Sequence, residues 1–292
     1  MRDHDGDTGA GGSTIERGTF SASDGVDLAF TLALPAGPPR AALVLSHGLA
    51  EHVGRYAHVL EALAARGFAV HAHDHRGHGN SGGTRVFVER FAEYAADIQT
   101  ALGRLKTRFP GVPKVLFGHS MGGLVVIDHL LRYPGEAAAA VLSGPGVEVG
   151  VKVPAWKDAL GKVMSHLLPK LAIPTGIPPE HVSRDAEVVR AYASDPLVSK
   201  KATARWYVEF LATQARAFAG APELRTPMLV VYGTEDRLVS PASIARWAEK
   251  VGSPDKTVIP YPGLYHEVVN EPEREVVLGD ILRWLESRFP AA

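Results

Sequence analysis

The sequence predicts an α/β fold with a mostly parallel sheet, flanking helices and an inserted helical segment. Three observations support this: short apolar runs alternate with helical periodicity, the first two runs lack a helix between them, and the alternation stops over residues 147–220. The strand-like runs are residues 26–34, 41–46, 69–73, 114–117, 139–143, 228–232 and 256–259. The helical stretches between them are residues 56–65, 91–109, 124–133, 241–251 and 273–288.

The first two strand-like runs, 26–34 and 41–46, are joined by a loop too short for a helix. We therefore expect them to pair antiparallel at one end of the sheet. Most later runs are preceded by a helical stretch, which predicts parallel strands. Ligands of such a sheet bind beyond the carboxyl ends of its strands, so the residues just after each run are the candidates for chemistry.

The segment 147–220 is too long to be a single crossover between two strands. It contains a proline-rich stretch at 173–179 and a helical stretch at 200–218, which predicts a cap over the strand ends. We assign 15–146 and 221–292 to the core, and the Asp- and Gly-rich residues 1–14 to a disordered tail. The first part of the cap places apolar residues on one helical face: Trp156, Leu160, Val163, Met164, Leu167, Leu168 and Leu171.

The composition limits the partners and the chemistry. With 31 Lys and Arg against 32 Asp and Glu among 292 residues, the chain has no electrostatic field to recruit nucleic acid. It has no cysteine, which excludes disulfides, thiolate catalysis and thiolate metal sites. The sequence shows neither a signal peptide nor an apolar run of about 18 residues, so we expect a cytoplasmic protein with at most peripheral membrane contact. The oligomeric state stays open.

Residues 118–123 read Gly-His-Ser-Met-Gly-Gly, a G-x-S-x-G pattern between a strand-like run and a helical stretch. A turn of this kind holds the serine in a strained backbone conformation that small neighbours permit, and exposes its hydroxyl at the start of a helix. The pattern alone is common, but the strand before it and the helix after it indicate a functional turn. The sequence therefore predicts that Ser120 is a nucleophile.

A serine nucleophile needs a base and an acid that orients the base, and both residue types follow later strand-like runs. The loop after 228–232 contains Glu235 and Asp236, of which we select Asp236 as the acid. The loop after 256–259 contains His266, which we select as the base. Taken singly, either could be a surface or structural residue, but the two lie in suitable strand-end loops in suitable order.

The negative charge that develops on an attacked carbonyl needs backbone N–H donors. The residue after the nucleophile, Met121, is the expected first donor of this oxyanion hole. The loop after 41–46 begins His47-Gly48-Leu49, so Leu49 is the expected second donor, and Gly48 lets the backbone turn its N–H inward. This chemistry requires no cofactor.

His71, His73 and His75 alternate along one strand and, together with Asp74, could suggest a metal site. The order H-x-H-D-H lacks the extra spacing of binuclear hydrolase motifs, and no second cluster with metal-ligand spacing follows. We therefore expect no metal. The stretch from Asp74 to Gly79 is better explained as a turn that organises the strand end.

Several motifs together resemble the α/β-hydrolase family, and more narrowly its monoacylglycerol lipases. They are residues 47–56 (HGLAEHVGRY), 73–79 (HDHRGHG), 118–123 (GHSMGG), 192–197 (YASDPL) and 263–267 (GLYHE). Generic hydrolases share only the second and third motifs, and the chain order serine, aspartate, histidine is also that of α/β-hydrolases. The resemblance covers nearly everything after the tail, and it implies an eight-stranded sheet with a helical cap.

The resemblance implies a serine esterase that hydrolyses monoacylglycerols to fatty acid and glycerol through an acyl-enzyme on Ser120. In the resembled enzymes the glycerol headgroup is held by residues that correspond here to Glu51, Arg55, His119 and Tyr192. A site that hydrogen-bonds free hydroxyls disfavours a triacylglycerol, which has none. The apolar face of the cap would then hold the single acyl chain and offer a surface for lipid contact.

Three alternatives stay open at this point. A lysophospholipase also removes one acyl chain, although its charged headgroup favours a basic pocket and only Arg55 supplies a positive charge here. A broad carboxylesterase would use the same catalytic residues on other esters. A non-catalytic binding member of the fold would be expected to lack a complete triad.

Overall fold

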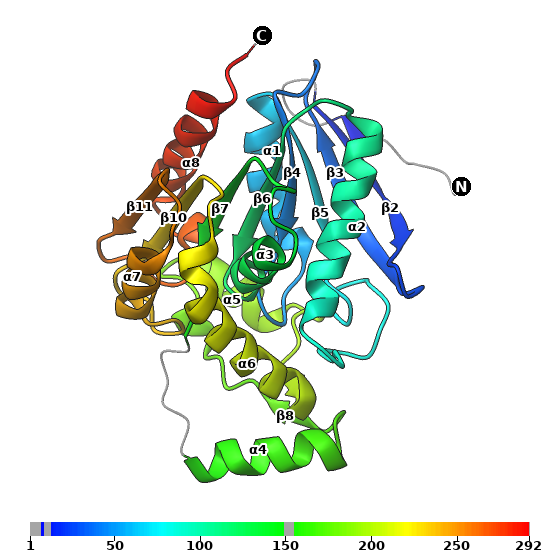
Figure 1. Cartoon of the computed structure of the whole chain (residues 1–292), viewed down its shortest axis with the longest axis vertical. Helices are drawn as coiled ribbons and strands as arrows, with labels where there is room; N and C mark the ends of the chain where they lie inside the picture. Colours follow the sequence, from blue (N-terminus) through cyan, green and yellow to red (C-terminus); the bar gives the residue numbers. More distant parts are fainter. Residues whose placement is uncertain (1–6, 9–12, 149–154, 292) are drawn as a thin grey trace.

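The computed structural model describes residues 7–8, 13–148 and 155–291 of the chain (Figure 1). Its main sheet has the strand order β1-β2-β3-β5-β4-β6-β7-β10-β11. The strands are β1 (Asp7–Thr8), β2 (Thr14–Ser21), β3 (Asp27–Leu34), β4 (Ala41–Ser46), β5 (Phe68–His73), β6 (Lys114–His119), β7 (Ala139–Ser143), β10 (Met228–Gly233) and β11 (Lys256–Tyr261). The strands from β5 to β11 in this order are mutually parallel, whereas β2 and β3 run antiparallel to their neighbours.

The central strands are buried on both faces, which explains why they appear in the sequence as continuous apolar runs. Every residue of β4, β6, β7 and β10 is buried. Side chains still alternate between the two faces: Leu43 and Leu45 belong to one hydrophobic cluster, and Val44 belongs to the other. The sheet thus separates two apolar cores, each of which needs its own layer of helices.

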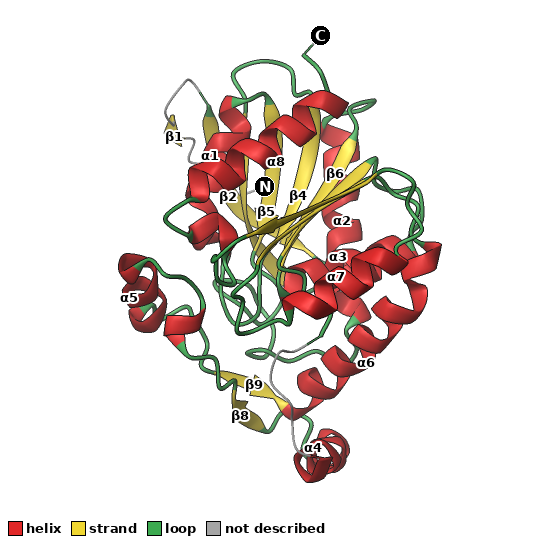
Figure 2. Cartoon of the chain, turned by 90° about the vertical axis from the view of Figure 1, so that its left-hand side faces the viewer, coloured by secondary structure: helices red, strands yellow, loops and turns green. Residues whose placement is uncertain are grey.

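Helices cover both faces of the sheet (Figure 2). On one face lie α1 (Ala57–Ala65) and α8 (Arg274–Arg288), whose buried Leu60 and Ile281 pack in the same cluster as Leu43. On the other face lie α2 (Ala92–Arg108), α3 (Met121–Arg132) and α7 (Pro241–Lys250). This three-layer arrangement fixes the carboxyl ends of the parallel strands as a rigid edge on which a site can be built.

The α/β fold with eight flanked strands is confirmed, and the two-residue β1 adds a ninth strand at the edge. β2 was not among the expected strands, because Glu16, Arg17 and Gly18 interrupt its apolar alternation. The expected tail, residues 1–14, overlaps β1 and the first residue of β2. The rest of that prediction, for residues 1–6 and 9–12, lies outside the described residues.

The expectation that residues 26–34 pair with residues 41–46 was wrong. β3 pairs antiparallel with β5, and β5 lies between β3 and β4. The physical reason is that the crossover through α1 makes β5 a parallel neighbour of β4. β5 then occupies the edge of β4 that faces β3. A short loop between two runs therefore did not make them neighbours.

The segment between β7 and β10 extends beyond the carboxyl edge of the sheet (Figure 1). It contains α4 (Ala155–Leu167), α5 (Ala186–Ser194) and α6 (Ala204–Gly220), and a small antiparallel pair of strands, β8 (Ala172–Pro174) and β9 (Lys201–Thr203). Helix α6 contacts both α3 and α4, so it connects α4 to the sheet layers. Within the described part of the chain, no helix is long and apolar enough to cross a membrane.

Candidate active site

Ser120 lies where β6 ends and α3 begins, at the carboxyl edge of the sheet. Its backbone has φ 53° and ψ −118°, a conformation that costs a non-glycine residue about 1–3 kcal/mol. Two hydrogen bonds hold this geometry: the N–H of Ser120 donates to Ser143 C=O at 2.9 Å, and the N–H of Gly146 donates to Ser120 C=O at 2.8 Å. The strained conformation is therefore stabilised by backbone contacts from the end of β7 and from the loop that follows it.

The glycines around Ser120 are required by close backbone contacts. A Cβ atom on Gly118 would lie 2.5 Å from the carbonyl oxygen of Gly122, and one on Gly122 would lie 2.1 Å from that of Ser46. Both distances are far below van der Waals contact, so a larger residue would push α3 away from the sheet. The two glycines thus let the strand and helix approach closely enough to form the sharp turn.

The structure brings together the three residues predicted as a triad. His266 Nε2 lies 2.8 Å from Ser120 Oγ, and His266 Nδ1 lies 2.7 Å from Asp236 Oδ2. The other oxygen of Asp236 accepts hydrogen bonds from two backbone N–H groups, those of Leu238 and Val239, at 2.8 and 3.0 Å. Glu235, the rejected alternative to Asp236, is exposed. The arrangement can move a proton from the serine to a fixed imidazole.

Asp236 also sets the charge preference of the imidazole. Burial is the largest single influence on His266 and lowers its basicity, but the carboxylates of Asp236, Glu267 and Glu51 together outweigh burial, with Asp236 contributing most. The net result is a pKa of His266 above its ordinary value of 6.5. The site is therefore prepared for the imidazolium that forms when the serine gives up its proton.

The loop after β4 carries Leu49 beside the serine, and both Leu49 and Met121 line the same pocket as Ser120. Neither the Leu49 nor the Met121 N–H donates a hydrogen bond to any other described residue. Ala50 has a left-handed φ of 63°, and its carbonyl accepts a hydrogen bond of 2.7 Å from the N–H of Ser199. This loop is thus held in a strained shape by the segment inserted between β7 and β10.

Glu51 supports the same loop from below. Its Oε1 accepts hydrogen bonds from Gly48 N–H at 2.5 Å and from Tyr56 Oη at 2.6 Å, and its Oε2 accepts a bond from Arg55. Burial opposes the charge on this carboxyl, but Arg55 and nearby groups lower the pKa of Glu51 to about 2. Glu51 is therefore an ionised side chain, held by three hydrogen bonds, that fixes the backbone one residue before Leu49.

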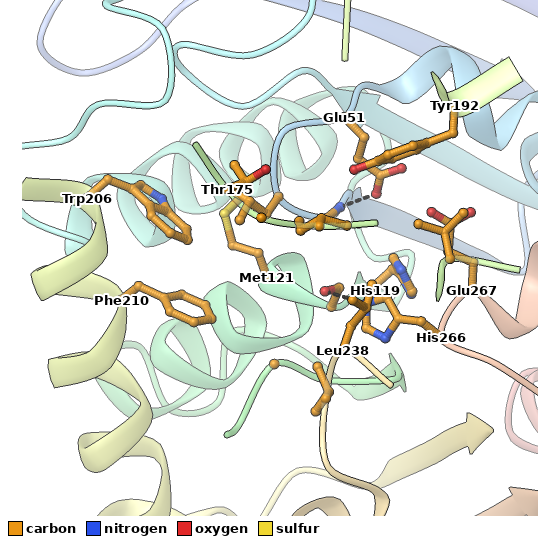
Figure 3. A pocket seen from close by; sticks show the side chains of 18 of the residues that line it. Glu51, His119, Met121, Thr175, Tyr192, Trp206, Phe210, Leu238, His266 and Glu267 are labelled. Atoms are coloured by element: carbon orange, nitrogen blue, oxygen red, sulfur yellow. Dashed lines mark hydrogen bonds between the residues drawn. The ribbon is translucent and has the colours of Figure 1, made fainter. Parts of the chain in front are cut away.

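The pocket at Ser120 is a cavity of about 340 Å³ with two chemically different ends. Figure 3 shows Trp206 and Phe210 at one end and Glu51, Tyr192 and Glu267 at the other, with His266 below Glu51 and Glu267 in this view. Tyr207 lies on the same helix as Trp206 and Phe210, whereas Ile177, Val182 and Leu238 pack around Tyr192. Such a pocket suits an elongated ligand with an apolar part, a reactive centre and a polar headgroup.

At the polar end, Arg55 is enclosed by two carboxylates. Its guanidinium donates to Glu51 and makes a bidentate contact with Glu267, with both distances 2.7 Å. The same guanidinium lies 4.9 Å from the centre of the Tyr192 ring. Glu51, Tyr192 and Glu267 line the pocket, whereas Arg55 is not among its lining residues. Arg55 thus lies behind the pocket wall and connects these three residues.

His119 is the remaining predicted headgroup residue, and it lines the pocket beside the base. Its ring centre lies 4.9 Å from that of His266, and its Nδ1 is 3.2 Å from Ser143 Oγ. Burial, together with the nearby His266, lowers the pKa of His119 to about 4. His119 is therefore a neutral hydrogen-bonding group at neutral pH.

Sequence reasoning missed Glu267, although it lies in the GLYHE motif directly after His266. It also assigned the acyl chain to the stretch 156–171, whereas the described residues that line the apolar end of the pocket lie on another helix. The apolar end of the pocket is lined by α6, and none of Val163, Met164, Leu167, Leu168 and Leu171 lines it. The side chains of Trp156 and Leu160 lie outside the described residues. An apolar stripe in the sequence does not reveal which of two neighbouring helices faces inward.

The stretch from Asp74 to Gly79 forms a turn, and the histidines before it are buried. Asp74 accepts hydrogen bonds from the backbone N–H groups of Val53 and Asn80 at 2.7 and 2.8 Å. It thereby connects the segment after β5 to the segment after β4. His71 and His73 are buried, and both rings make edge contacts with Phe20. Over the described residues, no group of three or more His, Cys, Asp and Glu is arranged to hold a metal ion.

Comparison with known proteins identifies the family to which this geometry belongs. The profile of the family described as serine aminopeptidase, S33, matches residues 37–273. The chain belongs to this hydrolase family. The S33 profile spans both halves of the sheet and the segment inserted between them, so the match includes Ser120, Asp236 and His266.

Individual relatives of this S33 hydrolase can be aligned with it over most of its length. The monoacylglycerol lipase of Mycolicibacterium smegmatis is 40% identical over 95% of this chain and 99% of its own length. The phospholipase YtpA of Bacillus subtilis is 33% identical over 83% of this chain and 93% of its own. The crystal structure of Paleococcus ferrophilus monoacylglycerol lipase is 33% identical, with TM-score 0.82, covering 90% of this chain and 98% of that one. The predicted α/β-hydrolase fold is thereby confirmed.

Proposed function

We propose that this chain hydrolyses monoacylglycerols to a fatty acid and glycerol. The observation that carries the proposal is one pocket lined by Ser120 and His266, by the aromatic residues Trp206 and Phe210, and by the carboxylates of Glu51 and Glu267, with Asp236 hydrogen-bonded to His266. The relatives named monoacylglycerol lipases, at 40% and 33% identity over most of the chain, support the same substrate.

In this proposal Ser120 attacks the ester carbonyl while His266 accepts its proton and Asp236 holds the imidazole. The proton then passes from His266 to the glycerol oxygen as the ester bond breaks and leaves an acyl-enzyme. Water attacks the acyl-enzyme by the same route and releases the fatty acid. The short contacts from His266 to both partners support these roles.

The backbone N–H groups of Leu49 and Met121 stabilise the oxyanion in this proposal. Their position on the pocket wall and their lack of other acceptors among the described residues support it. Losing one such donor typically costs about 3–4 kcal/mol of transition-state stabilisation. Because the donor is backbone, a side-chain substitution at Leu49 would not remove it.

The acyl chain lies along Trp206 and Phe210, and the glycerol headgroup lies at Glu51, His119 and Tyr192. Arg55 acts on the headgroup site through the carboxylates that it holds. One acyl chain occupies the apolar end, while a second or third chain would have to enter the polar end. Burying a chain against Glu51 and Glu267 would leave their charges without compensation, which disfavours di- and triacylglycerols.

Residues 147–220 act as a cap on this site, and the outer face of α4 contacts lipid. The exposure of Val163, Leu167 and Leu168, at 50%, 68% and 55%, supports contact with an apolar partner. This proposal keeps the cytoplasmic location that the sequence favours, with peripheral access to membrane-borne substrate.

A panel of substrates with one acyl chain length tests the proposal. We expect the largest kcat/KM for the monoacylglycerol, and smaller values for the diacylglycerol, the triacylglycerol and the lysophospholipid. Highest activity on the lysophospholipid would favour the alternative suggested by the relative named phospholipase YtpA. Equal activity on all esters would indicate a broad carboxylesterase. A folded chain that a fluorophosphonate fails to label at Ser120 would indicate a non-catalytic member of the fold.

A further inference from the structure

The headgroup end of the pocket contains two carboxylates among its polar groups. Glu51 and Glu267 line it, and their side chains are only 3% and 4% exposed. No lysine or arginine is among the described residues that line the pocket. Figure 3 shows both carboxylates on the same side of His266, next to the Tyr192 ring.

The positive charge of Arg55 behind this end is paired with both carboxylates. Its Nη1 donates to both Glu51 and Glu267, and its Nη2 donates to Glu267. The ring of Tyr192 covers one face of the guanidinium. Two carboxylates and one guanidinium leave one uncompensated negative charge, in a site that is more than nine-tenths buried.

This charge balance has a chemical consequence for any headgroup. An ionised carboxylate has only acceptor atoms, so a partner must donate to it. A free glycerol hydroxyl can donate, whereas a phosphate at neutral pH adds a second anion and offers mainly acceptors. Like charges brought together in a desolvated site repel by several kcal/mol.

We propose that Glu267 selects the headgroup: its carboxylate accepts a hydrogen bond from a glycerol hydroxyl and disfavours headgroups that carry a phosphate. The inference rests on the proposed function, and it adds a specificity-determining residue and a rejected substrate class. Glu267 is suited to this role because its side chain lines the same pocket as Ser120 and His266. It is held by Arg55 and by the amide of Asn270 at 2.9 Å, which limits its freedom to turn away from the ligand.

The test compares two substrates that differ only in the phosphate: 1-hexanoylglycerol and 1-hexanoylglycerol 3-phosphate, both as monomers in solution. The wild-type kcat/KM should be at least ~100-fold higher for the neutral substrate. Glu267→Gln removes the charge and introduces a donor, so this ratio should fall at least ~10-fold. Activity on methyl hexanoate, which has no headgroup hydroxyls, normalises for any general change at His266.

Glu275→Gln is the matched control, because it removes the same charge from a side chain that is 86% exposed. Its ratio should equal that of the wild type. Fluorophosphonate labelling of Ser120 counts the folded active sites in each preparation. If Glu267→Gln does not fold, the wild-type inhibition constants of 1-O-hexylglycerol and its 3-phosphate provide the same ratio without a variant.

Similar kcat/KM values for the two substrates in the wild type would overturn this inference, as would an unchanged ratio in folded Glu267→Gln. Similar inhibition constants for the two ethers would also overturn it. In each of these cases monoacylglycerol hydrolysis itself would stand. A wild-type chain that cleaves methyl hexanoate but not 1-hexanoylglycerol would instead overturn the proposed function, and the inference with it.

Discussion

At the residue scale, the charge state of His266 controls the reaction at Ser120. The imidazole must be neutral to accept the serine proton, so kcat/KM is high above its pKa and falls as the pH drops through it. Because Asp236 raises that pKa despite burial, the half-maximal point should lie above pH 6.5. A pH profile of kcat/KM on a soluble ester measures it.

Asp236→Asn is the variant that tests the cause of this shift. It keeps the shape of the side chain but removes the charge that raises the pKa of His266. We expect kcat to fall about 10⁴-fold, and the half-maximal point of the profile to move to lower pH. Glu235→Gln changes an exposed neighbour by the same charge and should leave the profile in place. An unshifted profile in Asp236→Asn would contradict the assignment of the acid.

Glu51 provides a second prediction at this scale. Glu51→Ala removes the acceptor that holds Gly48 N–H next to the proposed oxyanion donor Leu49. We expect kcat to fall roughly 10²–10³-fold both on a monoacylglycerol and on the methyl ester of the same fatty acid. Glu51→Gln keeps an oxygen for Gly48 and Tyr56 and should lose less. A loss confined to the KM of the monoacylglycerol would instead restrict Glu51 to headgroup binding.

Single residues were predictable from the sequence where a local rule fixes them. Ser120, Asp236 and His266 each follow a strand of a parallel sheet, and that rule alone brings their loops to one edge. Glu267 could not be singled out, because its proposed role depends on Arg55, which lies in a short 3-10 helix more than two hundred residues away. Pairing between buried charges is a property of tertiary structure that sequence spacing does not encode.

At the element scale, α4 presents an apolar surface whose described residues do not line the pocket. Leu167→Ser and Leu168→Ser should weaken binding to phosphatidylcholine vesicles by about 10-fold, without changing kcat/KM on a soluble short-chain ester. Vesicle co-sedimentation and an esterase assay measure the two effects.

Val276→Ser is the matched control for these variants. Val276 is 57% exposed, but it lies on α8, a helix that covers the sheet and is not part of the inserted segment. Vesicle binding in this variant should equal that of the wild type. If Leu167→Ser bound vesicles as well as the wild type, the proposed lipid contact would be contradicted.

Most element positions followed from periodicity, but their neighbours did not. β4 and β7 have the predicted bounds, because continuous apolar runs are typical of strands buried on both faces. The pairing of β3 was mispredicted because the crossover through α1 decides which strand lies beside β4. The sequence also did not indicate that α6 lines the pocket, since α4 and α6 are both amphipathic and only their packing separates them.

At the scale of the whole molecule, the buried histidines should make folding sensitive to acid. Burial, followed by repulsion from His47, lowers the pKa of both His73 and His78 to about 3. The unfolded chain therefore binds more protons between pH 6.5 and 3, so stability is complete above pH 6.5 and is lost as the pH falls through this window. At pH 5 each histidine should cost about 2 kcal/mol of unfolding free energy.

Urea unfolding at pH 7 and pH 5 measures this loss. His73→Leu should reduce the difference in unfolding free energy between pH 7 and pH 5, because it removes one titrating group. The substitution breaks no hydrogen bond, since neither ring nitrogen of His73 has a partner among the described residues. His166→Gln changes an exposed histidine and should leave the difference unchanged. Identical unfolding free energies at pH 7 and pH 5 in the wild type would contradict this account.

The central claim is that the pocket around Ser120 cleaves monoacylglycerols. The most direct measurement is the release of fatty acid from 1-oleoylglycerol by the wild type and by Ser120→Ala, with folding of both checked by circular dichroism. The account predicts turnover by the wild type and a loss of at least ~10⁴-fold in kcat for the folded variant. Full activity in Ser120→Ala, or no release by a folded wild type, would contradict it.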